Sequence, residues 1–517
     1  MPISQTGFIF QLVKSLSKSE KRNFRLYVNR IQGGEGIKFV ELFDVLDKQK
    51  VYDEEAIYTH FRGMSKTQFS NLKRHLYRQI LVSLRQVHIQ RNVDIQIREQ
   101  IDYAKILYGK GLYMQSLKLL ERAKAMAEKS HADLLHLEIA EFEKQIEARH
   151  ITRSRKEKER IPALIQESER RSQVIFNRTK LTNLKLEMHG IYIEHGHADK
   201  EEAKHTLTQF RDNKLPPFEY PQLTFFEKVD YHQIQVWYYY VLQNYTYCYR
   251  HAKHWIDLFM AQPNMQMRDP DLFMRGFHYL LTSAYNMNKP KHFTEGLAQF
   301  EAFNEANRDK FKINSRILSY IYRYQGRLNR SLMRGDFAEG LQHLPRIERR
   351  LKRYQDHMDV HRVMIFKYKI AALFLGIGNF DKALDYLNDI LDHEGNYLRK
   401  DIYVYSKLMS LIIHYELNNL TYLNYLVDQT ARLLAKQNDV QETPKAILKC
   451  FRTLLKKGEL DVDAYLAEQL AIFEQLKTQK RENRAFIYLD LTLWLKARLN
   501  KCTVEEIVQR RIQESVV

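Results

Sequence analysis

The stretch Ile370–Leu391, IAALFLGIGNFDKALDYLNDIL, decides the fold class of this 517-residue chain. Apolar residues recur every three or four positions before and after a short turn, as on the buried faces of two helices. Gly378 and Phe380 stand on either side of the turn, Ala383 is small enough to let two helices approach, and Leu387 continues the buried stripe. The stretch therefore predicts a helical hairpin.

The same register recurs along the chain. Two further strong copies have these turn and core residues: Gly111, Tyr113, Ser116, Leu120 and Ala123 in the first, and Gly335, Phe337, Gly340, Leu344 and Ile347 in the second. With weaker copies included, turns fall near positions 247, 291, 335, 378 and 418, which are 44, 44, 43 and 40 residues apart. Such regular spacing is the sequence signature of a repeat architecture.

A Gly-x-aromatic turn followed three residues later by a small residue resembles the tetratricopeptide repeat (TPR). The spacing here exceeds the roughly 34 residues of that repeat, and its Trp and Pro positions are mostly absent, so the resemblance is to a divergent member. It covers some 300 to 400 residues. The resemblance implies an all-α protein built as a right-handed, TPR-like α-solenoid of helical hairpins, with a small helical domain at the N-terminus.

Two domains are expected. Residues 1–93 form a basic helical domain with a possible helix-turn-helix at 53–91, and residues 94–517 form the solenoid. Possible breaks in the solenoid lie near 150–172, which is rich in charges of both signs, and near 212–223 and 262–271, where prolines cannot continue a helix.

The N-terminal domain contains a basic helix with no acidic residue. Ser65 and Gln68 have the spacing of a capping box, which predicts that a helix begins there. Its candidate contacts to nucleic acid or another anion are Lys66, Lys73, Arg74, Arg78 and Arg85. A second helix of this composition could enter the major groove of DNA. Alternatively, because its apolar stripe persists throughout, the helix caps or docks onto the solenoid.

The resemblance implies that the first helix of each hairpin lines a concave binding face. On these helices the candidate peptide-binding residues are Tyr322, Asn329, Tyr368, Tyr405 and Tyr415. With Arg323 and Lys369 beside them, they would suit an extended peptide or an acidic segment. The alternative is that the longer repeats shift the register and bury these side chains. The aromatic run at 230–255 has two interpretations as well, core packing or a platform for stacking.

Motifs for catalysis or cofactor binding are scarce. Four Glu-x-x-His pairs occur, but their flanking residues are polar, whereas a buried metal site should interrupt an apolar stripe. We therefore expect no catalytic residue, no cofactor and no metal. The three cysteines lie far apart, no apolar run is long enough to cross a membrane, and the chain starts without a secretory signal, so we expect a cytoplasmic protein.

Two functional hypotheses follow. The first is a non-enzymatic scaffold that binds a protein or peptide through the concave face of the solenoid. The second is a nucleic-acid-binding transcription regulator, with residues 53–91 as the reader and the solenoid as a sensor or dimerisation platform. The formal charge of +19 suits an anionic partner in either case, and a homodimer is possible.

Overall fold

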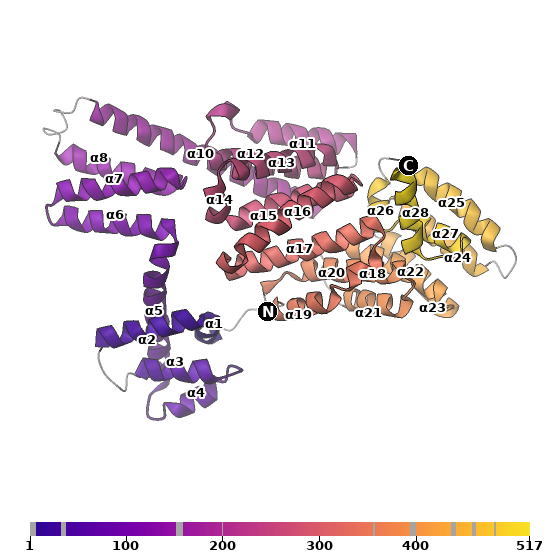
Figure 1. Ribbon diagram of the computed structural model, residues 1–517, viewed down its shortest axis with the longest axis horizontal. Helices are drawn as coiled ribbons and strands as arrows, with labels where there is room; N and C mark the ends of the chain where they lie inside the picture. Colours follow the sequence, from indigo (N-terminus) through magenta and orange to yellow (C-terminus); the bar gives the residue numbers. More distant parts are fainter. Residues whose placement is uncertain are drawn as a thin grey trace. The chain divides into compact units, whose positions relative to one another are not determined.

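A computed structural model describes residues 7–32, 38–150, 159–198, 200–354, 357–392, 400–435, 441–456, 462–479 and 482–516. Within these ranges the chain is helical and has no strand, which confirms the prediction of an all-α protein. The contacts divide the chain into two compact units, Met1–Phe176 (unit 1) and Asn177–Val517 (unit 2) (Figure 1).

Unit 1 contains two hydrophobic cores. The helices of the first core are α1 (Phe8–Ser15), α2 (Lys18–Gln32), α3 (Lys38–Lys48), α4 (Glu54–His60) and α5 (Lys66–His88). The second core lies among α6 (Val93–Gly109), α7 (Tyr113–Lys129) and α8 (Asp133–Arg149). The sequence predicts a domain boundary after residue 93, whereas the contacts place the division between the compact units after Phe176. Helix α10 (Arg160–His195) crosses that division.

Unit 2 is a succession of helices of one to six turns. Its first part contains α11 (Glu201–Lys214), α12 (Phe225–Val241), α13 (Tyr245–Ala261), α14 (Pro263–Arg268), α15 (Pro270–Asn286), α16 (Pro290–Asn307) and α17 (Ile313–Arg334). Its second part contains α18 (Phe337–Leu341), α19 (Leu344–Tyr354), α20 (Val360–Gly376), α21 (Phe380–Leu391), α22 (Lys400–Glu416), α23 (Leu420–Ala435), α24 (Glu442–Lys456), α25 (Val462–Thr478), α26 (Asn483–Tyr488), α27 (Leu491–Leu499) and α28 (Val504–Val516).

The hairpins share one backbone device at the turn. Gly378 has a φ of 78°, and the N–H of the following Asn379 bonds to the carbonyl of Phe374, five residues back. This is the arrangement that ends helices at a left-handed residue and satisfies their last carbonyls. The other left-handed residues followed by such a bond are Gly111, His131, Gln243, Asn288, Gly335, Asn418 and Lys501. Gly335, Gly378 and Asn418 stand at predicted turns, whereas the predicted turn positions 247 and 291 lie inside α13 and α16, a few residues after the left-handed Gln243 and Asn288.

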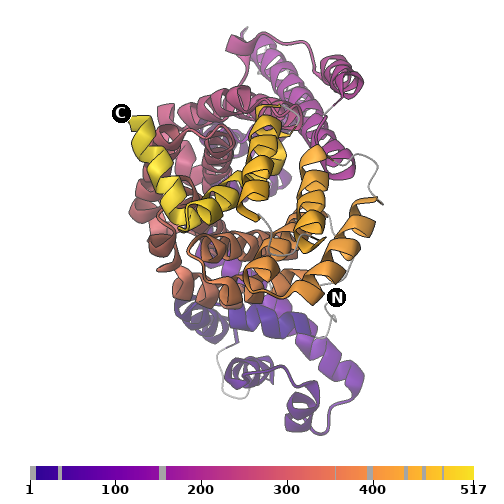
Figure 2. The ribbon, with the colours of Figure 1, turned by 90° about the vertical axis from the view of Figure 1, so that its right-hand side faces the viewer.

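Consecutive helices of unit 2 pack against one another. α12 contacts α13, α13 contacts α15, α15 contacts α16 and α17, and the same succession continues through α20, α21, α22 and α23. The result is a repeat-like arrangement compatible with a helical solenoid. The last helix also contacts α17 and α20, far away in the sequence, and Figure 2 shows the C-terminal helices (yellow) lying beside the helices of the middle of this unit.

The expected breaks have different outcomes. Residues 151–158 lie outside the described residues, while α10 begins at Arg160 and continues as one helix through the rest of that expected break. The prolines near 212–223 fall between α11 and α12, and those near 262–271 begin the short α14 and then α15. Helix α5 begins as the capping box predicts, because Ser65 and Gln68 exchange their side-chain to backbone hydrogen bonds.

Candidate functional site

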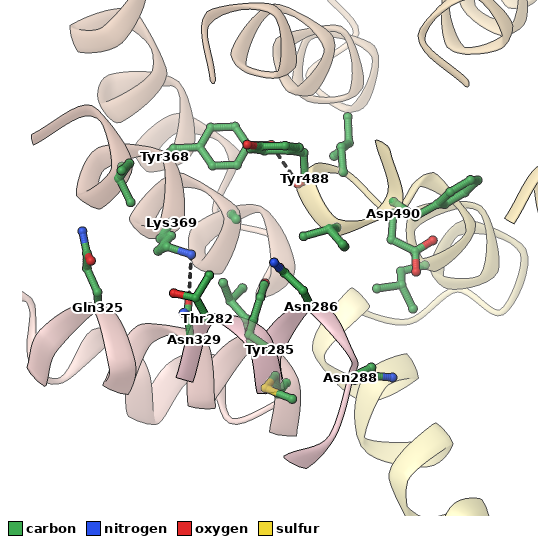
Figure 3. Close-up of a pocket in the computed structure, with 18 of the residues that line it drawn as sticks. Thr282, Tyr285, Asn286, Asn288, Gln325, Asn329, Tyr368, Lys369, Tyr488 and Asp490 are labelled. Carbon is green, nitrogen blue, oxygen red and sulfur yellow. Dashed lines mark hydrogen bonds between the residues drawn. The ribbon is translucent and has the colours of Figure 1, made fainter. Parts of the chain in front are cut away.

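A cavity of about 470 Å³ lies among the helices of unit 2. Three first helices of hairpins, α15, α17 and α20, contribute much of its wall, and further lining residues come from α12, α18, α22, α25, α26, α27 and α28. Figure 3 shows Lys369, Asn329, Thr282 and Asn286 near one another, with Asn288 and Asp490 set apart from them. Its volume is within the range of roughly 300–1,000 Å³ that is usual for ligand sites.

Amide side chains form a row along two of these helices. Asn286 comes from α15, while Gln325 and Asn329 lie one turn apart on α17, and Asn288 follows in the turn after α15. The side chains of Asn286 and Gln325 make no hydrogen bond to any other described residue, although Gln325 is only 8% exposed. A carboxamide carries both donors and acceptors, so the row can bond to a peptide backbone.

Lys369 places a positive charge beside this row. Its Nζ donates to the Oδ1 of Asn329 and lies 5.1 Å from the ring centroid of Tyr285 (Figure 3). Burial raises the pKa of Tyr285 to about 12, so its hydroxyl remains a donor at neutral pH. The ammonium group is therefore held by a neutral amide and an aromatic face, both of which leave its charge in place.

The wall formed by α15 and α17 also carries a stacked histidine and tyrosine. The rings of His278 and Tyr322 are 4.3 Å apart and almost parallel. Burial first, and then the positive charges of two arginines and Lys369, lower the pKa of His278 to about 3, so this histidine is neutral at pH 7. The arginines are Arg275 on α15 and Arg362 on α20, and neither pairs with a carboxylate among the described residues. This end of the site is electropositive.

The C-terminal helices close part of the cavity. The hydroxyl of Tyr368 on α20 donates to the carbonyl oxygen of Tyr488 at 2.8 Å (Figure 3). Asp490, which also lines the cavity, pairs with Lys477 at 2.6 Å. Further along, Glu505 of α28 accepts hydrogen bonds from the first two N–H groups of α18, at 2.6 and 3.0 Å. Segments 120 and 168 residues apart in the sequence thus meet here.

The five predicted peptide-binding residues separate into two groups. Tyr322, Asn329 and Tyr368 line the cavity, whereas Tyr405 and Tyr415 do not. Tyr405 is buried and stacks on Tyr488, with ring centroids 4.8 Å apart, and Tyr415 packs edge-on against the Trp494 ring. These two side chains hold the C-terminal helices in place.

Sequence reasoning missed several lining residues. Thr282, Tyr285 and Asn286 lie on α15, which is the first helix of its hairpin as α17 is of the next, so the hairpin pattern could have identified this helix as part of the wall. Tyr488 and Asp490 had no such signal, because they reach the cavity from outside the repeat pattern. Arg323, which the sequence placed beside the site, pairs with Glu301 at 3.2 Å instead.

The predicted anion-contact residues on α5 do not share one face. Arg74, Arg78 and Arg85 are exposed along one side of the helix, and Lys66 is exposed at its first turn. Lys73 points toward α4, where it pairs with Glu54 at 2.5 Å. The ring of Phe69 on α5 contacts the rings of Tyr58 and Phe61, which fixes α4 against the beginning of α5.

Within the described residues, no cluster of three or more His, Cys, Asp and Glu side chains has the geometry to hold a metal ion. None of the described helices has the length and apolar character needed to cross a membrane. Comparison of the chain with protein-family models, with curated proteins and with solved structures finds no match.

Proposed function

We propose that unit 2 is a divergent TPR-like α-solenoid that binds an extended, acidic peptide segment of a partner protein, and that the chain acts as a non-enzymatic scaffold. The observation that carries the proposal is the cavity, in which amide side chains from successive hairpins lie beside Lys369. Stacked helical repeats commonly bind their partners on such a curved inner surface.

The amide row supports an extended peptide as the ligand. A peptide backbone presents an N–H and a carbonyl at every residue, and carboxamides on consecutive helices can bond to both. Asn286 is half-buried and Gln325 is buried, and neither side chain has a hydrogen bond to another described residue, so their donors and acceptors are available to a ligand.

The charges support an acidic segment. Among the charged residues that line the cavity, Lys369, Lys477 and Arg511 are positive, while Asp490 is the one carboxylate of the described wall and already pairs with Lys477. A carboxylate of the ligand near Lys369 would lie in a partly dehydrated site, where the attraction between opposite charges is stronger than in water.

The test is binding of fluorescein-labelled peptide pools, measured by fluorescence polarisation. One pool has random sequences with glutamate fixed at several positions, and the second has glutamine at the same positions. We expect the glutamate pool to bind more tightly, and Lys369→Glu to weaken its binding by about tenfold or more, which corresponds to about 1.4 kcal/mol.

The matched control is Lys382→Glu, which reverses a charge on α21 at a lysine that is exposed and pairs with Asp385. This variant should bind the glutamate pool as the wild type does. Equal binding of the two pools by the wild type, or an equal loss in both variants, would contradict the proposal.

A further inference from the structure

The solvent-facing side of α5 combines arginines with large apolar side chains. Six of the exposed residues in the middle of the helix, Arg74, Tyr77, Arg78, Leu81, Val82 and Arg85, are here called the α5 face. At 3.6 residues per turn they fall within about 140° of the helix circumference and extend over about 17 Å. Tyr77, Leu81 and Val82 are 42%, 44% and 38% exposed, respectively.

The opposite side of the helix accounts for the packing of α5. Phe69, Leu76 and Ile80 are buried in the first core of unit 1, where α5 contacts α2 and α3. The apolar residues of the α5 face are not part of that core. The helix therefore has enough buried surface to hold its position, and it carries a second apolar stripe that lies outside the hydrophobic cores formed by the described residues of unit 1.

Positive charge on the α5 face is only weakly neutralised. Arg78 makes no ion pair with any described carboxylate, and Arg74 bonds to the neutral side chain of Asn71. Arg85 pairs with Asp102 at 3.2 Å, but both side chains are more than half exposed, and such pairs contribute little. Helix α5 itself has no acidic residue.

We propose that the α5 face docks an amphipathic helix of a partner protein in which acidic residues flank an apolar stripe. Tyrosine and arginine are the residue types that contribute most at protein interfaces, and an amphipathic helix places apolar anchors every three or four residues, as on the α5 face. Duplex nucleic acid fits less well, because surfaces that bind DNA are polar and strongly basic. Here Leu81 and Val82 interrupt the arginines, and Lys73 is turned toward Glu54.

The test uses the full chain and three labelled probes. The first is a synthetic amphipathic helix with leucine along one stripe and glutamate on both flanks, the second has the same residues in an order that destroys the stripe, and the third is a random-sequence DNA duplex. The variants are Arg78→Glu and Leu81→Ser. Arg22→Glu reverses an exposed charge on α2 of the same unit and is the control. Circular dichroism checks that each variant is folded.

We expect the amphipathic helix to bind at least tenfold more tightly than the reordered peptide. Arg78→Glu and Leu81→Ser should each weaken that binding by about tenfold, and Arg22→Glu should leave it unchanged. Lys369→Glu should also leave it unchanged, which separates this site from the cavity. The proposal is overturned if neither α5 variant affects the peptide, or if the duplex binds and only Arg78→Glu weakens it. Self-association of the chain that Leu81→Ser abolishes, seen by analytical ultracentrifugation, would also overturn it.

Discussion

The cavity of unit 2 and the α5 face of unit 1 combine positive charge with aromatic side chains in opposite surroundings. In the cavity, Lys369 is fixed between Asn329 and the ring of Tyr285, and the C-terminal helices cover part of the space. On the α5 face, Arg78 has no described ionic partner and water surrounds it. Residues of the same types thus stand in very different surroundings at the two places.

The surroundings predict two modes of binding. An enclosed site imposes geometry on a ligand, because its polar groups are already oriented and partly dehydrated. An open face adapts to many partners and depends on charge that salt can screen. If the two sites differ in this way, perturbations of packing should affect the cavity, and perturbations of ionic strength should affect the α5 face.

The largest expected effect comes from adding a side chain at Gly376, at the end of α20. A Cβ there would lie 2.1 Å from a ring atom of Phe337, which is buried and lines the cavity. We expect Gly376→Ala to destabilise unit 2 by about 2 kcal/mol, because the clash outweighs the better helix propensity of alanine. Urea unfolding followed by tryptophan fluorescence measures this, since Trp237, Trp255 and Trp494 all lie in unit 2.

The control for this prediction is Gly190→Ala in α10, where a Cβ would meet nothing within 4 Å. It should leave the stability of unit 2 unchanged or raise it by up to about 1 kcal/mol. Binding of the acidic amphipathic helix to the α5 face should be the same in both variants. Loss of that binding in Gly376→Ala would show that the two sites are not independent.

The second largest expected effect is a difference in how strongly salt weakens binding at the two sites. When ionic strength rises from about 0.1 M to about 1 M, the Debye length falls from about 10 Å to about 3 Å. We expect binding of the amphipathic helix to the α5 face to weaken by at least about tenfold, and binding of the glutamate peptide pool to weaken by less than about threefold. Fluorescence polarisation at each salt concentration measures both. Equal losses would remove the distinction between an enclosed and an open site.

Acid should destabilise unit 2 through its buried histidines. Burial, together with the charges of His251 and His254, lowers the pKa of His232 to about 3. In the unfolded chain the histidine has a pKa of about 6.5 and takes up a proton below that pH, whereas in the folded chain it stays neutral. The free energy of unfolding is therefore highest above pH 6.5 and falls as the pH decreases toward the pKa of the folded state. When the pH falls from 7.5 to 5.5, this histidine should lower the free energy of unfolding by about 1.4 kcal/mol.

His232→Gln should remove that part of the pH dependence of urea unfolding, again followed by tryptophan fluorescence. The hydrogen bonds of His232 to Tyr220 and His251 would change as well, so the comparison uses the slope of stability against pH rather than its value at one pH. An unchanged slope would mean that this histidine is not neutral in the folded protein.

The smallest expected effect comes from weakening the contact between α28 and the beginning of α18, beside the cavity. Glu505→Ala removes the acceptor for two backbone N–H groups of α18, the role of a helix cap, and should destabilise the contact of α28 by about 1 kcal/mol. We expect the glutamate pool to associate faster in stopped-flow measurements, because the cavity opens more often. Glu514→Ala, at an exposed glutamate of the same helix, should not change the rate.

Sequence patterns were sufficient to predict the helices and part of the wall of the cavity. The spacing of apolar residues and the turn at Gly378 report local structure, so they predict hairpins, and the register then places Tyr322 and Tyr368 on the helices that line the cavity. The role of Tyr405 could not be predicted in the same way. Its ring stacks on Tyr488, and only the fold shows that this distant segment lies there.

The α5 face illustrates the same limit. The absence of acidic residues is visible in the sequence, and so is the buried stripe that includes Leu76. The sequence does not show that Leu81 and Val82 lie outside the core, because apolar residues on two sides of a helix look alike in one dimension. Nor does it show that Lys73 pairs with Glu54 across the turn.

Hydrogen exchange of the full chain, with and without the glutamate peptide pool, distinguishes the cavity from the α5 face as the site that binds the acidic peptide. The account predicts slower exchange in α15, α17 and α20, which form the wall of the cavity, and unchanged exchange in α5. Protection of α5 with no change in those three helices would contradict it, because the acidic peptide would then bind the open face and the cavity would not be the peptide site.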